Sequence, residues 1–145
     1  MLSFPELLQA MIRGEVDPPP VATLVGLRLV SAASGRAVFQ LEVERRHANP
    51  MGTVHGGILC DLADAAMGVS FASTLGDGES FTTLELKISF LRPVRTGLLT
   101  ATGAVVERGR TIGLVECRVI DPDDRLVAHA TSTCMVLRGE AAAGR

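Results

Sequence analysis

Alternation of apolar and polar residues predicts that most of the chain forms β-strands. In segment 36–44 every second residue from Phe39 to Val43 is apolar, with Gln40 and Glu42 between them. This period of two puts one kind of side chain on each face of a strand. Similar alternation, or a short apolar run between turn formers, predicts strands at 24–33, 36–44, 81–91, 98–107, 111–120 and 126–137.

One stretch departs from this alternation and predicts a long helix. Nearly every residue from 58 to 72 is apolar or small, and Asp61 and Asp64 are its only charged residues. A helix that is apolar on almost every side belongs in a protein core. A carboxylate on such a helix costs free energy unless a partner satisfies it or a reaction uses it. The two aspartates are therefore candidate functional groups.

The order of these elements, two strands, one helix and four further strands, defines the fold class. Strands that follow one another through tight turns pair antiparallel. We therefore expect an α+β protein with an antiparallel six-stranded sheet wrapped around one long central helix. Because the other face of the sheet and its edges need cover, we expect a homodimer at least, and pairing of dimers into a homotetramer.

The first 20 residues are expected to stand apart from this sheet. Segment 4–13 has the apolar spacing of a short amphipathic helix, with Pro5 in its first turn. The run 17–20, Asp-Pro-Pro-Pro, ends any helix and acts as a spacer. We therefore divide the chain into an N-terminal helix with a Pro-rich spacer (1–20), the sheet domain (21–138) and a disordered tail (139–145).

Composition excludes several classes of function. The net charge of -2 over 145 residues provides no basic surface for nucleic acid, and the absence of Trp and Tyr removes the usual platforms for base stacking. An odd count of three cysteines inside predicted helix or strands indicates reduced core residues. Without a signal-like N-terminus or a charge-free stretch of membrane-spanning length, we expect a cytoplasmic protein with no membrane partner.

The loop before the helix carries the strongest chemical signal. Residues 49–57 read Asn-Pro-Met-Gly-Thr-Val-His-Gly-Gly, a sequence rich in turn formers. Gly56 and Gly57 open the helix, where backbone N–H groups lack intrahelical partners and the helix dipole is positive. Having no side chains, they let a substrate carbonyl approach closely, and His55 could donate a further hydrogen bond. A reaction that passes through an oxyanion needs such donors; the alternative is a tight turn into the helix.

The segment 49–57, Asp64 on the following helix and the strand around 82–90 together resemble the hotdog-fold acyl-CoA thioesterases. The chain is most similar to the phenylacetic acid degradation subgroup, over about residues 22–137. The resemblance implies a hotdog fold and hydrolysis of an acyl-CoA thioester to free acid and CoA. It implies no cofactor, because coenzyme A is part of the substrate. No metal is expected either, because the histidines and aspartates lack the spacing of a recognised ligand set.

The resemblance also implies which residues carry the reaction. The family places its acid nine residues after the histidine, which selects Asp64. Asp64 would be the general base for water or the nucleophile, and both roles remain open. Asp61 would then be a hydrogen-bonded structural carboxylate. Gly56 N–H would be the oxyanion donor.

Two further positions match the family pattern. Thr83 stands where the family has a hydroxyl residue that positions the water or the acid. Asn49 would orient His55 or the catalytic water, while the alternative is an ordinary turn residue before Pro50.

Helix geometry separates the two halves of this predicted site. Gly56 and Asp64 are eight residues apart, which is ~12 Å along one straight helix. An Asp side chain cannot cover that distance to a carbonyl held at Gly56, so one subunit cannot supply both groups to one substrate. We therefore expect Asp64 of a neighbouring subunit, on an antiparallel helix, to complete each site, and we expect monomers to be inactive.

Further residues are expected to bind the substrate. Met51, Met67 and Phe71 should wall the pocket, with Gly57 beside the oxyanion donor. The small residues of the helix leave room for an aryl or medium-chain acyl group. The hairpin Arg108-Gly109-Arg110 can offer guanidinium and backbone donors to the phosphates of CoA, although a solvated hairpin tip fits it as well.

Two other functions stay open. A non-catalytic acyl-CoA-binding or sensing module would share the fold but is expected to lack the acid, and Asp64 is present. Hotdog proteins also include dehydratases and hydratases of acyl thioesters, but the proline-rich histidine loop of the dehydratases is missing. The resemblance therefore favours a thioester hydrolase.

Overall fold

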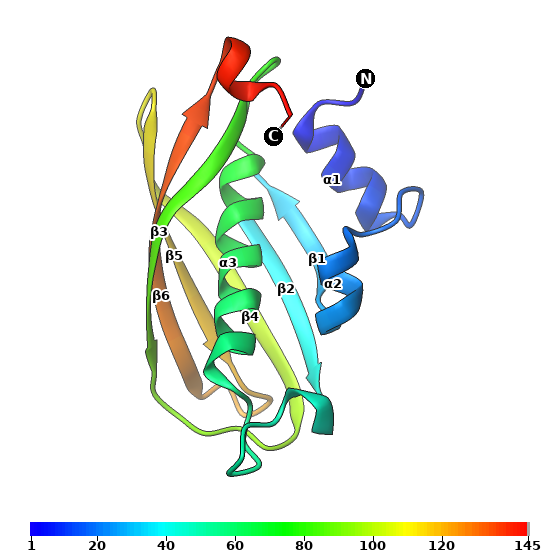
Figure 1. The fold of residues 1–145 in the computed structure, drawn as a ribbon, viewed down its shortest axis with the longest axis vertical. Helices are drawn as coiled ribbons and strands as arrows, with labels where there is room; N and C mark the ends of the chain where they lie inside the picture. Colours follow the sequence, from blue (N-terminus) through cyan, green and yellow to red (C-terminus); the bar gives the residue numbers. More distant parts are fainter. Residues whose placement is uncertain (145) are drawn as a thin grey trace.

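Helix α3 (Gly56–Ala72) lies against one face of an antiparallel six-stranded sheet (Figure 1). The computed structural model describes residues 1–144. The strands are β1 (Arg28–Ala33), β2 (Arg36–Val43), β3 (Ser80–Phe90), β4 (Gly97–Arg108), β5 (Ile112–Ile120) and β6 (Leu126–Leu137). Helices α1 (Phe4–Ile12) and α2 (Pro20–Val25) precede the sheet, and short 3-10 turns lie at Arg45–His47 and Gly139–Ala142. The predicted α+β architecture is confirmed.

The strand order differs from a simple succession of hairpins. Along the sheet the order is β1-β2-β4-β5-β6-β3, so β3 lies at an edge and pairs with β6. The expectation that a tight turn joins 81–91 to 98–107 is wrong, because residues 91–96 carry the chain from the β3 edge to the middle of the sheet. Helix α3 crosses the sheet, so the strand that follows it, β3, lies at the edge opposite β1. Strands β4, β5 and β6 then lie between β2 and β3.

Helix α3 rests almost directly on the backbone of β4. Gly103 of β4 faces the helix, and a Cβ atom added there would overlap the carbonyl group of Ala66. Leu62, Ala63 and Met67 on the same helix are fully buried. This close approach maximises dispersion contacts between helix and sheet, and it leaves the helix little freedom to rotate or slide.

Helix α2 (Pro20–Val25) reaches into the segment for which the sequence predicted a strand. Leu24 and Val25, which we placed in the strand 24–33, belong to α2. Pro20 suits the first helical turn, and Gly26 ends the helix with a φ of 93°, a left-handed conformation that glycine adopts readily. The first strand therefore begins later than predicted, at Arg28.

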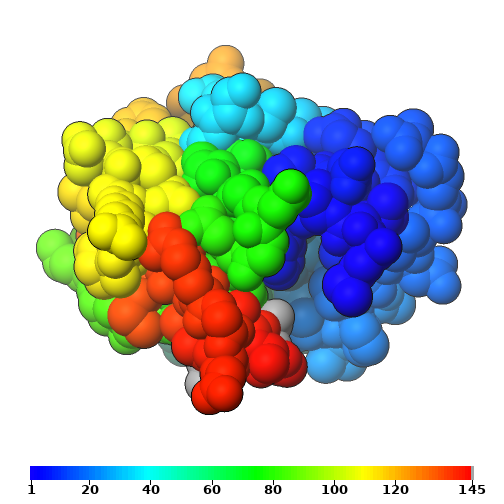
Figure 2. All heavy atoms as spheres, turned by 90° about the horizontal axis from the view of Figure 1, so that it is seen from above, coloured from blue at the N-terminus to red at the C-terminus, as the bar shows by residue number. Residues whose placement is uncertain are grey.

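Helix α1 packs against the sheet, contrary to the expectation that a spacer holds it apart. Gln9 Nε2 donates a hydrogen bond to Ala32 O at 2.7 Å, and the Phe4 ring lies edge-on to Phe81 with centroids 6.2 Å apart. The N-terminal segment (blue) forms one flank of the molecule when it is seen from above (Figure 2). The physical reason is the apolar stripe of α1, which needs a surface to cover it.

The remaining expectations concern the cysteines and the chain ends. Cys60, Cys117 and Cys134 are free thiols, as expected. Gly139–Ala142, within the predicted disordered tail, forms a 3-10 turn, and Arg145 lies outside the described residues. Among the helices of the described chain, none is both long and apolar enough to cross a membrane.

Replacing Gly103 by Ala tests the close approach of α3 to the sheet. The new methyl group would overlap Ala66, so we expect the free energy of unfolding to fall by about 1–3 kcal/mol, the usual cost of overpacking a core. Chemical denaturation measures this loss. Gly68→Ala is the matched control, because its new Cβ would lie 3.5 Å from the Phe81 ring, an ordinary contact, and Ala favours a helix. A Gly103→Ala protein as stable as the wild type would contradict this packing.

Candidate functional site

Asn49 holds together the loop that leads into α3. Its Oδ1 accepts hydrogen bonds from the N–H groups of Met51 (3.0 Å) and Thr53 (3.1 Å), and its Nδ2 donates to Thr53 Oγ1 (2.8 Å). These bonds make an Asx-type turn, which is the ordinary role of Asn at such a position. They support the turn-residue alternative for Asn49. That Asn49 also orients His55 or a water stays a prediction.

His55 is the N-cap residue of α3. Its Nδ1 accepts a hydrogen bond from Gly57 N–H at 2.8 Å. A ring nitrogen that accepts carries no proton, so the neutral ring has its proton on Nε2, where it is available to a ligand. Gly56 is the first residue of the helix, and no acceptor for its N–H is present among the described residues. Gly56 is therefore better placed than Gly57 to donate to an oxyanion.

Both glycines also have a packing role within the subunit. A Cβ atom on Gly56 would lie 2.9 Å from Phe90 Cζ, and one on Gly57 would lie 2.9 Å from His55 Nδ1. These close approaches favour glycine at both positions, but the Phe90 ring near Gly56 is exposed and can move aside for a small side chain. The tight turn that we considered as an alternative is thus present, and it leaves the Gly56 N–H free.

A β-bulge turns Thr83 toward the helix. The register between β3 and β6 shifts between Thr83 and Glu85, so Leu84 is an extra residue, and its side chain is exposed. Strict alternation would put Thr83 and Leu86 on opposite faces, whereas a bulge brings both to the same side. Thr83 lines a cavity beside α3, and Leu86 packs against the core. The Thr83 hydroxyl is close enough to Asp64 to favour its ionised form, and it also lies 3.9 Å from Cys134 Sγ.

The pKa of Asp64 lies above the ordinary value for an Asp. Surrounding protein atoms remove part of its hydration, the negative charge of Asp61 acts in the same direction, and the hydrogen bond with Thr83 opposes both. Asp64 is nevertheless open to solvent on the isolated subunit. A carboxyl group that is partly desolvated yet reachable is typical of a functional site.

Asp61 does not have the structural role that we expected. It is exposed one turn before Asp64, and its carboxylate has no hydrogen bond or ion pair within the described part of the chain. Its effect is electrostatic, through the pKa of Asp64. Asp61 also lines the same cavity.

Asp64 and Thr83 line a cavity of about 510 Å³ between α3 and the N-terminal segment. Most of its lining is apolar and comes from α1, α2, β1 and β3 as well as α3. Besides the two aspartates, α3 contributes Ala65, Gly68, Val69 and Ala72. A mostly apolar cavity with a few polar groups at one place is the usual form of a small-molecule site.

Met67 and Phe71 lie in the core, not in this cavity. Both side chains are fully buried, and Phe71 stacks under the guanidinium group of Arg108. Consecutive residues of an α-helix point about 100° apart, so Met67 faces the sheet while Gly68 faces the cavity. The prediction that Met67 and Phe71 line the substrate pocket is therefore wrong for this cavity, because both side chains pack in the core. Met51 is exposed on the loop.

The predicted phosphate hairpin is occupied by contacts within the subunit. Arg108 donates to Thr74 Oγ1 at 3.0 Å and lies 3.5 Å from Glu79, and Gly109 N–H donates to Ile112 O at 2.9 Å. Arg110 is exposed. The hairpin lies at the opposite end of α3 from the loop 49–57 (Figure 1). These contacts favour the hairpin-tip alternative for residues 108–110.

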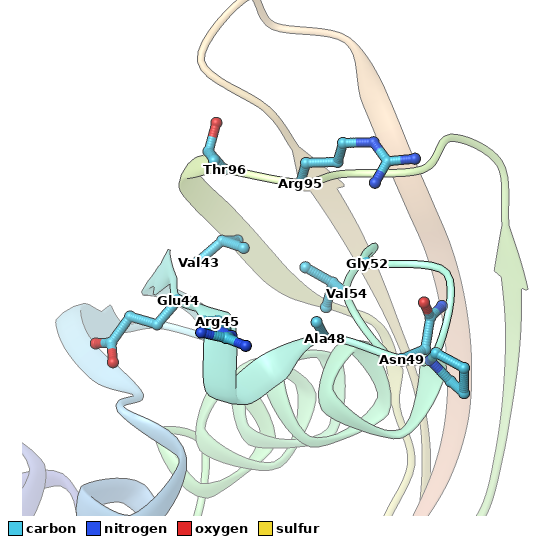
Figure 3. A pocket seen from close by; sticks show the side chains of 10 residues that line it. Val43, Glu44, Arg45, Ala48, Asn49, Gly52, Val54, Arg95 and Thr96 are labelled. Carbon is cyan, nitrogen blue, oxygen red and sulfur yellow. The ribbon is translucent and has the colours of Figure 1, made fainter.

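A second cavity, of about 450 Å³, adjoins the loop 49–57 and contains two arginines. Arg45 comes from the 3-10 turn and Arg95 from the crossing segment 91–96 (Figure 3). Arg95 donates to Met51 O at 3.1 Å. Glu44 also lines this cavity, and its carboxylate is paired with Arg46 at 3.0 Å. The cavity thus offers guanidinium groups close to the loop that carries Gly56.

Within one subunit the two halves of the predicted site remain apart. Asp64 and Thr83 are together at the cavity, while His55 and Gly56 are at the first turn of α3. The helix between them is uninterrupted, so eight residues correspond to ~12 Å along its axis.

The sequence interpretation missed the N-terminal contribution to the cavity. Phe4, Leu7, Leu8 and Met11 of α1 line it, together with residues between 18 and 22. The amphipathic pattern of segment 4–13 was the available signal, because an apolar helix stripe implies a surface that it covers.

Comparison with known proteins defines the class to which this fold and site belong. The thioesterase superfamily model matches residues 51–128. The chain therefore belongs to the thioesterase superfamily, and it is a thioester hydrolase. The 1,4-dihydroxy-2-naphthoyl-CoA hydrolase of Listeria monocytogenes is 30% identical over 112 residues, which cover 77% of this chain and 91% of that protein.

Solved structures agree on the fold. A phenylacetic acid degradation-related protein from Ralstonia eutropha shares 35% identity with a TM-score of 0.80, covering 88% of this chain and 98% of that one. The E. coli PaaI protein, from the phenylacetic acid degradation operon, shares 27% identity with a TM-score of 0.80, covering 96% and 98%. The predicted hotdog fold and the resemblance to the phenylacetic acid degradation subgroup are confirmed.

Titration of Asp64 tests the electrostatics of the site. We expect its carboxyl carbon, followed by ¹³C NMR, to titrate above the ordinary value of 3.8. Asp61→Asn should lower the Asp64 pKa because it removes a negative charge, and Thr83→Val should raise it because it removes a hydrogen bond to the ionised form. A wild-type pKa at or below 3.8 would contradict the desolvated environment.

Proposed function

We propose that this protein hydrolyses acyl-CoA thioesters, with Asp64 as the catalytic carboxylate. The observation that carries the proposal is the pair of Asp64 and Thr83 at an apolar cavity beside the buried helix. The acyl group would lie in the cavity and the thioester carbonyl carbon near the Asp64 carboxylate. Ionised Asp64 would either deprotonate a water or attack the carbonyl carbon itself, and Thr83 would hold the carboxylate in place for either step.

Gly56 N–H would stabilise the oxyanion of the same reaction. The N–H is free and at the positive end of α3, and donors of this kind contribute a large part of the catalysis of acyl transfer. His55 Nε2–H would add a second donor. Since one subunit holds these donors ~12 Å from Asp64, each site would combine Gly56 and His55 of one subunit with Asp64 of its neighbour.

The edge strand β3 is the proposed dimer contact. It is 11 residues long, and only β6 pairs with it within the described chain. An open edge of that length is a template for another strand, and a two-fold axis at this edge would run the two α3 helices antiparallel. Pairing of such dimers into a tetramer stays a prediction, for which the exposed outer sheet residues Val106, Ile112 and Leu114 are a suitable surface.

The phosphates of CoA are better matched by Arg45 and Arg95 than by Arg108. The first two line the cavity beside the Gly56 loop, whereas Arg108 is engaged by Thr74 and Glu79. Guanidinium groups bind phosphate through paired donors.

Release of free CoA from a panel of acyl-CoAs tests the assignment of Asp64. Asp64→Asn keeps the size of the side chain but removes its charge, so we expect the rate to fall by about 10²–10⁴-fold. Asp61→Asn is the matched control on the same helix and should keep most of the activity. Equal rates in wild type and Asp64→Asn would remove Asp64 from the mechanism. Tight binding of acyl-CoA by the wild type without turnover would favour the sensing module.

Mixed dimers test whether each site is shared between subunits. Gly56→Pro removes the N–H, and Pro is well tolerated at the first position of a helix; we expect a loss of about 10²–10³-fold. Gly56→Ala keeps the N–H and serves as its control.

Co-expression of the Gly56→Pro and Asp64→Asn chains should restore activity, because each mixed dimer then contains one site with both groups intact. Failure of mixed dimers to recover activity, with dimerisation confirmed by tandem affinity tags, would place both groups in one subunit.

A further inference from the structure

We infer that the N-terminal segment 4–22 forms the wall of the acyl site opposite α3 and sets the longest acyl group that the enzyme accepts. This inference rests on the proposed function, because it assigns the cavity at Asp64 to the acyl group. It concerns a part of the chain that precedes the residues matched by the superfamily model, 51–128. The limit on acyl length would thus be set by the N-terminal segment of this chain.

Four of the eight Phe, Leu and Met side chains that line the cavity come from this segment, and the other four are Leu27, Leu29, Phe39 and Phe81. Helix α1 contributes Phe4, Leu7, Leu8 and Met11, while the facing part of α3 contributes the smaller residues Ala65, Gly68, Val69 and Ala72. Small residues on α3 leave space without shaping it. The width of the cavity between α3 and the opposite wall is therefore set by the side chains of α1.

Helix α1 is held firmly enough to act as a wall. Its N-terminus is closed by a capping box between Ser3 and Glu6, which is a stabilising arrangement for a short helix. Gln9 bonds to Ala32 of β1 at 2.7 Å, and the Phe4 ring contacts the Phe81 ring of β3. The helix is thus tied to both sheet edges that border the cavity, and Leu8 is buried.

The size and chemistry of the cavity indicate the substrate class. Its volume of about 510 Å³ is within the ~300–1,000 Å³ of typical ligand sites, and its apolar walls match an unbranched medium-chain or aryl-acetyl group. Each methylene buried there should increase kcat/KM by about fourfold, until the chain meets α1.

Two substitutions on α1 should move this limit in opposite directions. Leu7→Trp fills the cavity, so we expect the ratio of kcat/KM for the longest accepted acyl-CoA to kcat/KM for acetyl-CoA to fall by about tenfold or more, the equivalent of two lost methylene contacts. Met11→Ala removes bulk and favours the helix, so the optimum should move to longer chains. Leu24→Trp and Leu24→Ala are the matched controls, because Leu24 is exposed on α2 and outside the cavity lining.

The measurement is the profile of kcat/KM against acyl length for purified full-length proteins whose folding is checked by thermal melting. Opposite shifts for Leu7→Trp and Met11→Ala, with both Leu24 variants unchanged, support the wall. Unchanged profiles in both α1 variants overturn it, and if Leu7→Trp does not fold, Met11→Ala alone decides. If neither the wild type nor any variant hydrolyses any acyl-CoA of the series, the proposed function is overturned. Calorimetric binding of the same acyl-CoA series would then still show whether α1 limits chain length.

Discussion

The contact of α3 with β4 is the constraint on which the rest of the molecule depends. At Gly103 the strand has no side chain, and the helix backbone at Ala66 occupies that space. The helix is thereby fixed in rotation, with Leu62, Ala63 and Met67 toward the sheet. The opposite orientation of Asp64 and Gly68 follows, because a rigid helix that buries one face must present the other. The N-terminal segment, together with β1 and β3, encloses the cavity on that side.

The same rigid helix separates two kinds of chemistry. At its first turn, His55 uses its Nδ1 to cap Gly57 and leaves Gly56 N–H free, which gives a compact group of donors. Two turns later lies the carboxyl group of Asp64, which we propose as the catalytic carboxylate. Neither group can approach the other without unfolding the helix. The assembly that we propose through the β3 edge would solve this problem, because it would bring the first turn of one helix toward the middle of another.

Asp64 also shows how function and stability oppose one another. Its pKa is raised in the folded chain, first by desolvation and then by Asp61. A carboxyl group whose folded pKa exceeds its unfolded pKa reduces stability at higher pH, where it is ionised, and this cost is absent at low pH, where both states bind the proton. The thiol of Cys117, whose pKa is raised to about 12 by burial, has no such conflict because it stays neutral. This stability cost thus falls on the residue that we assign to catalysis.

The sequence by itself determined the strands, the buried helix and the glycine-histidine loop, because these depend on local periodicity and on turn-forming residues. It also placed Asp64 and Gly56 too far apart for one subunit, since the rise of a helix is the same in every protein. Only the tertiary structure decided which side of β3 Thr83 occupies, because one bulged residue at Leu84 reverses the alternation on which strand predictions depend. Only the tertiary structure likewise showed that α1 closes the cavity and that Met67 and Phe71 face away from it. A residue's neighbours from distant segments, and the exact rotation of a helix against a sheet, are set by packing that a single segment does not encode.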